Sequence, residues 1–309
     1  MAGGTGGTRG ADERVDRLTL LETFVRVAER GGLSAAARDL ALSQPTVSRR
    51  IARLEARLGT TLLRRTTHAS APTADGLALL EDARRLLAGW EAVEERHAGD
   101  GTALAGTVRT VAPVGLGQTR LGPAVAAFLG AHPGVSIEWR LTDRPIRFAE
   151  EGCDCWIRIG PIADGRLVVR ELARVERLVV AAPAPVEAHA DGPLEAMPWL
   201  ALGPFEGARI ELFGAEGERR AFTVRPRFAT DSLFALRDAA LAGLGAAILP
   251  RWLVARELAE GALVDVAPRW RAARLPVNLA VAAGPGRPAR IGAFAEAVAE
   301  HLRGEVDVV

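Results

Sequence analysis

The chain of 309 residues has no lysine, no tyrosine and only two cysteines, Cys153 and Cys155. Two cysteines are too few for a disulfide framework, and without a second Cys or His pair they do not make a structural zinc site. The first 17 residues hold no apolar run like that of a signal peptide, and the longest apolar stretch, near Leu241, stops at Pro250. These absences predict a protein of the reducing cytoplasm that is neither secreted nor embedded in a membrane.

The remaining composition is that of a folded protein, with 49% apolar and 25% charged residues. A chain of this length exceeds what one hydrophobic core usually organises, so we expect two or three domains. Residues 17–70 carry ten arginines and four acidic residues, although the whole chain has a net charge of only +1. A basic segment in an otherwise slightly acidic chain indicates that this segment meets a polyanion.

The apolar spacing near the N-terminus predicts three short helices, over 18–29, 34–40 and 44–58. Thr19 with Glu22 is expected to cap the first helix, Ser34 the second and Ser43 the third. Only about three residues separate the second helix from the third. Two short helices joined so tightly form a helix-turn-helix, whose second helix can enter a major groove.

The next segment, 60–72, is short and polar and suits a two-stranded wing. A long helix is then predicted from 73 to about 97. Its apolar side recurs at alternating spacings of four and three residues, through Leu79, Ala83, Leu86, Trp90, Val93 and His97. We call this stripe the seam. It indicates dimerisation through the helix, the alternative being that the stripe packs on its own domain.

A glycine-containing segment at 98–106 has the composition of a hinge. Beyond it, strands alternate with helices. The expected strands are 107–113, 135–141, 155–159, 167–172, 176–182, 222–228, 246–249, 263–266 and 277–282, and a helix over 289–302 closes the chain. This alternation predicts α/β layers with mostly parallel strands.

Several motifs in this order resemble the LysR-type transcriptional regulators. They are the stretches LSAAARDL (33–40), LSQPTVSRRI (42–51), LRRTT (63–67), EGCDCWIRIG (151–160) and GLGAAILP (243–250). The resemblance extends from Leu18 to Arg303. It implies an α/β protein with an all-α N-terminal part, in which a winged helix-turn-helix and a linker helix precede an effector domain like the periplasmic binding proteins.

The implied domain boundaries follow the same motifs. They are a tail at 1–16, the DNA-binding domain at 17–72, the linker and dimerisation helix at 73–98, a hinge at 99–106, the effector domain at 107–303 and a tail at 304–309. Within the effector domain, subdomain one is expected at 107–160 and 267–303, and subdomain two at 161–266. The resemblance also implies a homodimer through the linker helix, a tetramer of two dimers, and a place on the nucleoid in the bacterial cytoplasm.

Carried over from the family, the base-reading residues lie on the third helix and are Gln44, Pro45, Thr46, Ser48 and Arg49. Their chemistry fits double-stranded DNA, because Gln can pair with adenine and Arg with guanine. Further expected DNA contacts are Ser34, Arg50, Arg53, Arg64, Arg65 and Thr66, although Arg50 and Arg53 could instead be merely solvated. The wing departs from the family pattern, because His68 and Ala69 replace further arginines, and this weakens the case for minor-groove insertion.

The expected small-molecule effector lies between the subdomains, where strands end and helices begin. The expected contacts are Pro113, Val114, Gly115, Leu116, Gly117, Thr142, Asp143, Arg158, Ile159, Gly160, Thr230, Asp231, Ser232 and Pro250. Arg158 and nearby helix starts favour a small polar or anionic ligand. Two alternatives stay open: Arg158 pairs with Asp154 or Asp143, and Asp231 caps its own helix.

Two other classes of function compete with a ligand-responsive regulator. An enzyme is not expected, because the chain has no Gly-x-Ser-x-Gly elbow, no His-Glu-x-x-His and no Walker sequence. A DNA-binding repressor or architectural protein that senses no ligand is the remaining alternative. No metal or cofactor is expected: the five histidines form no ligand spacing, and Cys153 and Cys155 are interpreted as small hydrophobes rather than a redox pair.

Overall fold

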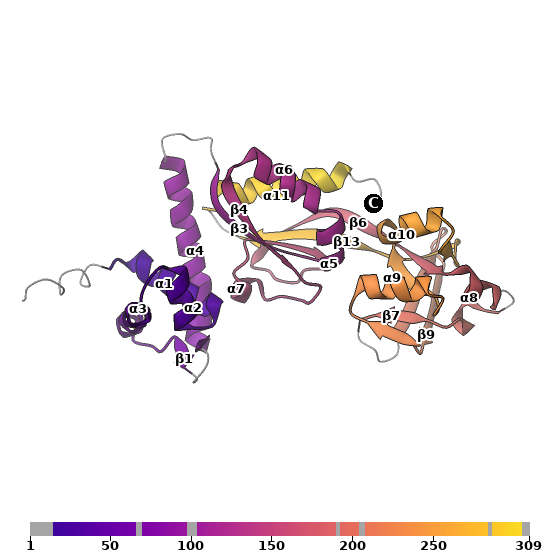
Figure 1. Ribbon diagram of the computed structural model, residues 1–309, viewed down its shortest axis with the longest axis horizontal. Helices are drawn as coiled ribbons and strands as arrows, with labels where there is room; N and C mark the ends of the chain where they lie inside the picture. Colours follow the sequence, from indigo (N-terminus) through magenta and orange to yellow (C-terminus); the bar gives the residue numbers. More distant parts are fainter. Residues whose placement is uncertain are drawn as a thin grey trace, which may run out of the picture. The chain divides into compact units, whose positions relative to one another are not determined.

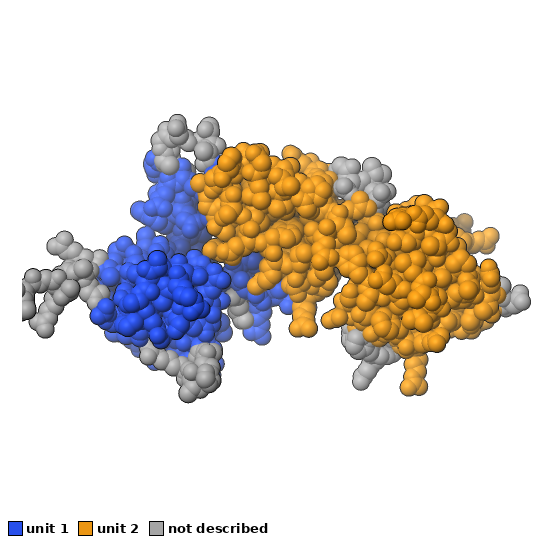
Figure 2. Space-filling model, in the orientation of Figure 1, with its two compact units in different colours: residues 1–104, 145–153, 284–292 blue, residues 105–144, 154–283, 293–309 orange. Residues whose placement is uncertain are grey.

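A computed structural model of the protein describes residues 15–65, 70–97, 104–189, 192–203, 208–283 and 286–304. The chain divides into two compact units, coloured separately in Figure 2. Unit 1 contains residues 1–104, 145–153 and 284–292, and unit 2 contains residues 105–144, 154–283 and 293–309. Two short segments from the expected effector domain, 145–153 and 284–292, therefore group with the DNA-binding and linker helices.

Unit 1 begins with three short helices, α1 (Arg17–Arg30), α2 (Leu33–Asp39) and α3 (Gln44–Leu58). Their apolar faces meet in one core, in which Leu20, Phe24, Val47 and Ile51 are fully buried. The helical period in the sequence therefore located all three elements to within a residue or two.

Two of the three expected helix caps are wrong. The side chain of Asp16, not a Thr19 and Glu22 box, caps α1 by accepting the N–H of Thr19 at 3.0 Å. Helix α2 starts at Leu33, so Ser34 already lies inside it and gives no capping hydrogen bond. Ser43 caps α3 as expected, accepting the N–H of Thr46 at 3.3 Å.

The turn between α2 and α3 depends on one strained residue. Ala41 adopts a φ of 51°, the left-handed region that non-glycine residues rarely occupy. The N–H of Leu42 then reaches back to the carbonyl of Ala37 at 2.9 Å. This conformation reverses the chain within the four residues, 40–43, that lie between the two helices.

The wing and the linker helix follow directly. Strands β1 (Leu63–Arg65) and β2 (Ser70–Pro72) pair antiparallel, and helix α4 runs over Ala74–His97. A Cβ on Gly76 would lie 2.1 Å from the carbonyl oxygen of Leu62, so only glycine fits where α4 leaves the wing. Thr66, His68 and Ala69 lie outside the described residues, as does most of the expected hinge at 99–106.

Unit 2 is built on one large sheet. Its strands are β3 (Ala105–Ala112), β4 (Gly134–Leu141), β5 (Cys155–Ile159), β6 (Leu167–Ala181), β8 (Ala208–Gly214), β9 (Arg219–Val224), β11 (Ala247–Pro250), β12 (Val264–Asp265) and β13 (Trp270–Ala282). The order along the sheet is β11-β6-β13-β5-β3-β4, with β12 on β6, β8 on β13 and β9 on β8. A second, two-stranded sheet pairs β7 (Leu200–Leu202) with β10 (Phe228–Thr230).

The expectation of mostly parallel strands is wrong. In the part of the chain that the structure describes, only β3 with β4, β3 with β5, and β7 with β10 pair in parallel as strands. The long strands β6 and β13 run antiparallel to each other. Within the described residues, β6 also pairs antiparallel with β11 and β12, and β13 with β5 and β8. The alternation of strand and helix correctly indicates layers, but it does not encode the direction of two strands that pass from one half of unit 2 to the other.

Helices cover the sheet on both halves (Figure 1). They are α5 (Val114–Thr119), α6 (Gly122–Ala131), α8 (Pro183–Glu187), α9 (Leu233–Leu241), α10 (Arg251–Ala259) and α11 (Ala289–Gly304), besides the short α7 (Phe148–Glu151) of unit 1 and a 3-10 turn at Leu194–Ala196. Phe128 of α6 and Phe294 of α11 pack edge to face with ring centres 5.3 Å apart. Within the described residues, no helix combines the length and the hydropathy needed to cross a membrane.

Candidate nucleic-acid interface and effector pocket

Helix α3 has one buried face and one exposed face. Val47, Ile51 and Leu54 are buried in the core. Gln44, Pro45, Arg49 and Arg53 are exposed, and Thr46 and Ser48 are half-buried. The base-reading residues expected from the sequence therefore share the accessible side and the first turns of one helix, which is the geometry that a major groove accepts.

Short polar contacts organise the start of this helix. The hydroxyls of Ser43 and Thr46 lie 2.8 Å apart. The guanidinium of Arg49 donates to the Thr46 hydroxyl at 3.4 Å. Arg49 is exposed, so its side chain is held near the helix N-terminus while remaining accessible to a ligand in front of it.

Arg50 behaves differently from its neighbour. Its guanidinium donates to the hydroxyl of Thr23 at 3.2 Å, and Thr23 is fully buried on α1. The Thr23 hydroxyl in turn donates to the carbonyl of Thr19 at 2.7 Å. Arg50 thus joins α3 to α1, which favours a structural role over the DNA contact that the sequence suggests.

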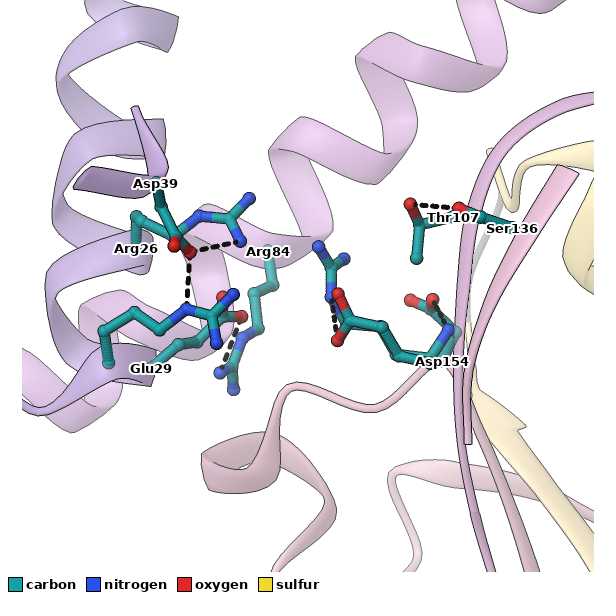
Figure 3. A network of polar contacts seen from close by, with 10 residues as sticks. Arg26, Glu29, Asp39, Arg84, Thr107, Ser136 and Asp154 are labelled. Atoms are coloured by element: carbon teal, nitrogen blue, oxygen red, sulfur yellow. Dashed lines mark hydrogen bonds and ion pairs between the residues drawn. The ribbon is translucent and has the colours of Figure 1, made fainter. Parts of the chain in front are cut away.

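The other expected DNA contacts are scattered around α3. Ser34 is exposed on α2, and Arg64 is exposed on β1. The side chain of Arg65 and the whole of Thr66 lie outside the described residues. On the α1 side, Arg26 pairs with Asp39 at 3.5 Å and Arg84 pairs with Glu29 at 3.2 Å (Figure 3).

Unit 2 contains a small surface pocket at the ends of three parallel neighbours, β3, β4 and β5. It is lined by Pro113, Thr142, Asp143, Arg144, Trp156, Ile157, Arg158 and Ile159. Five of these residues are effector contacts expected from the sequence: Pro113, Thr142, Asp143, Arg158 and Ile159. The structure adds Arg144, Trp156 and Ile157. Strand alternation could have identified Trp156, because residues two apart lie on one face of a strand.

Arg158 is a half-buried cation of this pocket and rests against an aromatic ring. Its guanidinium lies 5.3 Å from the centre of the Trp156 ring. In the part of the chain that the structure describes, Arg158 has no ion pair with a carboxylate. Asp154 instead accepts the backbone N–H of Arg109 at 2.8 Å, so the alternative of a structural pair with Asp154 or Asp143 is wrong.

Asp143 occupies the entrance to helix α5. Its carboxylate accepts the N–H of Val114 at 3.1 Å. The pKa of Asp143 is raised above its ordinary value, chiefly by partial burial and further by the charge of Asp231, while the Val114 hydrogen bond opposes the shift. The first amide of α5 is therefore already taken by a side chain of the protein.

The glycines of the segment 113–117 serve packing rather than the presentation of amides. Residues Val114–Thr119 form α5, and Gly115, Leu116 and Gly117 are buried. A Cβ on Gly115 would lie 3.1 Å from Cη2 of Trp252, and a Cβ on Gly117 would lie 2.3 Å from Cδ2 of Leu141. These glycines let α5 approach α10 and β4 closely.

The remaining expected contacts do not line the pocket and have structural roles. Ser232 caps α9 by accepting the N–H of Ala235 at 3.3 Å, so the alternative that Asp231 caps this helix is wrong. Thr230 accepts the N–H of Ser232 at 3.1 Å. Gly160 accepts the amide of buried Asn278 at 2.8 Å, and Pro250 immediately precedes α10.

The two cysteines are buried, with Cys153 8% and Cys155 0% exposed. The described residues contain no group of three or more His, Cys, Asp or Glu side chains placed to hold a metal ion. The pocket of unit 2 offers a ligand an arginine and an aromatic ring, Arg158 and Trp156.

Two family models match the chain. The bacterial regulatory helix-turn-helix protein, lysR family, matches residues 18–77, and the LysR substrate binding domain matches residues 101–303. The HTH-type transcriptional regulator PtxR of Pseudomonas aeruginosa is 31% identical over 306 residues, covering 94% of this chain and 95% of the relative. The uncharacterised HTH-type transcriptional regulator YhjC of Escherichia coli K12 is 30% identical over 277 residues, covering 86% and 91%.

Solved structures show the same architecture. CrgA, a LysR-type transcriptional regulator from Neisseria meningitidis, aligns with a TM-score of 0.56 at 26% identity, covering 94% of this chain and 99% of that one. ArgP from Mycobacterium tuberculosis aligns with a TM-score of 0.68 at 23% identity, covering 94% and 98%. The expected fold, a helix-turn-helix part followed by an α/β effector domain, is confirmed.

The chain belongs to the LysR family of bacterial transcriptional regulators. It is a DNA-binding regulator with an effector-binding domain, and its relatives are regulators rather than enzymes. Members of this family bind DNA and small-molecule effectors and form oligomers, as the sequence predicts for this chain.

The raised pKa of Asp143 predicts a stabilising substitution in the pocket. Asp143→Asn keeps an acceptor for the Val114 N–H and removes a charge that the folded state disfavours, so the melting temperature at pH 7 should rise, by less than about 1 kcal/mol in unfolding free energy. Because the folded pKa of Asp143 lies above the unfolded one, its unfavourable contribution is present at pH 7 and is lost as the pH falls, so the difference in melting temperature between the variant and the unmodified protein should be smaller at pH 4. Calorimetry at pH 7 and pH 4 measures both effects.

The matched control is Asp164→Asn. Hydrogen bonds from Arg166 lower the pKa of Asp164, so removing that charge should lower the melting temperature at pH 7. An Asp143→Asn variant that melts below the unmodified protein at pH 7 would contradict the environment assigned to Asp143.

Proposed function

We propose that this regulator reads its operator with the exposed side of α3 and that a small anionic molecule, bound beside Arg158, changes this binding. The site residues and the domain boundaries inferred from the sequence are part of the proposal. The observation that carries the DNA half is the separation of Arg49, which is exposed, from Arg50, which is held against α1. The protein would act on nucleoid DNA in the cytoplasm.

Arg49 is therefore assigned a base contact. Arg49→Ala should weaken binding to the specific operator by about 1 to 3 kcal/mol while leaving binding to random duplex nearly unchanged. The operator is the tightest duplex obtained by in vitro selection with the full-length protein, and affinities are measured by fluorescence anisotropy at fixed salt.

Two controls frame this result. Arg64→Ala on the wing should weaken specific and random duplexes alike, because a phosphate contact carries no sequence information. Arg50→Ala should lower the melting temperature, since it removes the link to Thr23. Equal losses on operator and random duplex for Arg49→Ala would refute its role as a base reader.

The effector half rests on Arg158. Its guanidinium sits over Trp156, lines the pocket and has no ion pair among the described residues, so it can receive a carboxylate or phosphate. Arg144, which is exposed, adds a second cation to the lining, whereas Asp143 opposes an anion on the α5 side. This distribution favours an anion seated toward β5.

Arg158→Ala should abolish the response to whichever carboxylates or phosphates raise the melting temperature of the unmodified protein in a thermal-shift screen. The variant should still melt cooperatively and bind the selected duplex, because Arg158 holds no other part of the fold by an ion pair. An unchanged ligand response in a folded Arg158→Ala protein would remove this residue from the site.

Dimerisation through α4 is the third element of the proposal. Leu86 and Trp90 of the seam are 58% and 48% exposed, although Leu79 packs on the unit 1 core and Ala83 is buried. An apolar stripe of this size on a helix is normally covered. We propose that a second copy covers it, and that two dimers associate through effector domains into a tetramer.

Substituting Glu at both Leu86 and Val93 should dissociate the dimer and weaken operator binding, since two half-sites are contacted jointly. Light scattering at micromolar concentration measures the mass. Leu77→Glu is the control, because Leu77 is also exposed on α4 but lies outside the seam. A monomeric mass for the unmodified protein in light scattering would contradict the proposed dimer.

A further inference from the structure

Arg290, in the first turn of α11, is an unusually well-held arginine. Its side chain is only 8% exposed. One guanidinium nitrogen contacts Glu95 of α4 at 2.6 Å, and another contacts Glu91, one helical turn earlier. The N–H of Ala289 donates to the second oxygen of Glu95 at 2.7 Å. One arginine and one backbone amide thus bind two carboxylates of the linker helix.

The backbones also meet closely at this point. Gly286 has a φ of +86°, and a Cβ there would lie 3.3 Å from the Cα of Gly89 on α4. Glycine on both sides permits the approach. The segment that precedes α11 is therefore seated on α4 by shape as well as by charge, within unit 1.

The same side of α4 receives the other effector-domain segment of unit 1. Arg84, which shares a helix face with Glu91 and Glu95 by its spacing, pairs with Glu29 of α1 at 3.2 Å, with both side chains 18% exposed. A Cβ on Gly152 would lie 2.7 Å from the facing atoms of both Arg84 and Glu29. The seam residues Leu86 and Trp90 fall on another face of the helix, so α4 has separate faces for a second copy and for its own effector domain.

Helix α11 is continuous over Ala289–Gly304, and residues up to 292 count with unit 1 while residues from 293 count with unit 2. We propose that Arg290, Glu91 and Glu95 form a latch that holds the first turn of α11 on α4, and that opening this latch is how a change in the effector domain reaches the linker helix. The DNA part of this inference rests on the proposed function.

The charges make the latch reversible. Glu91 is 49% exposed, so water can solvate it when Arg290 leaves, whereas an apolar contact of similar size would resist opening. The acidic side of α4 also needs a cation when closed. Burial raises the pKa of Glu22 on α1, and the charges of Asp16, Glu91 and Glu94 raise it further. The charge of Arg50 offsets part of this repulsion on Glu22, and Arg290 pairs directly with Glu91 and Glu95.

A double-mutant cycle in the full-length protein tests the latch. Hydrogen exchange of the α4 peptides from residue 86 to residue 97 should become at least tenfold faster in Arg290→Gln and in Glu95→Gln, and the double variant should be no faster than either single one. Exchange in α1 to α3 should stay unchanged. Arg303→Gln is the control, because Arg303 lies on the same helix and pairs with Glu296 at 3.7 Å, with both side chains more than half exposed.

Swapping the two charges of the latch should rescue its closed state. Arg290→Glu should open the latch, and adding Glu95→Arg should restore slow exchange on α4. The latch would be overturned if the effects of the two single variants were additive, or if the charge swap did not restore slow exchange. It would also be overturned if exchange in α1 to α3 became equally faster, because that would show general destabilisation.

The proposed effect of the latch on DNA binding is tested on the operator duplex obtained by in vitro selection. Arg290→Gln should change the affinity at least threefold, or the length of the DNase I footprint, relative to Arg303→Gln. A variant with faster α4 exchange but DNA binding equal to the control would overturn the coupling. Failure of the unmodified protein to select any duplex would instead count against the proposed function and leave the exchange result standing for the latch.

Discussion

Antiparallel pairing of the two long strands β6 and β13 is the constraint on which unit 2 depends. Their register runs from Ala272 opposite Arg177 to Ala282 opposite Leu167, with two irregularities on the way. At one end β13 continues onto β8, and at the other it pairs with β5 through Val277 to Val281. The hydrogen bonds between β6 and β13 therefore join the two halves of unit 2. Trp156 and Arg158 lie on β5, so the position of the pocket follows from this pairing.

Arginine is the only strong cation of this chain, and its surroundings decide what each copy does. Arg49 and Arg50 are neighbours on α3, yet one is exposed and the other donates to a buried threonine. Arg158 rests on an aromatic ring, and Arg290 is enclosed by two glutamates. A planar guanidinium with five donors suits all of these settings, because it can stack, fork or bridge. One residue type thereby supports recognition, ligand binding and structure.

The linker helix combines these roles in one element. One face carries Leu86 and Trp90, which remain exposed in a single chain. Another carries the carboxylates that hold Arg290. A helix is rigid over its length, so a shift imposed on one face moves the other. Such a helix can connect the state of an effector domain with the spacing of two DNA-binding domains without any contact between the ligand and the DNA.

The sequence alone determined the elements and their order. The helical period located α1 to α3, the Ser43 cap marked the start of α3, and the motifs identified the family. These features are local, because a cap, a turn or an apolar stripe is encoded within a few residues. Five pocket residues were also predicted, because the ends of strands can be located in the sequence and ligands bind where strands end and helices begin.

Only the tertiary structure decided which of these residues act together. Arg50 stands at the edge of the buried stripe of α3, and its turn toward Thr23 requires α1 to be in place. Gly115 is needed for the ring of Trp252, which is far away in the chain. The direction of β6 and β13 and the pairing of Arg290 with Glu91 and Glu95 likewise join distant segments. Contacts of this kind depend on how surfaces pack after the local elements exist, and no short stretch of sequence contains both partners.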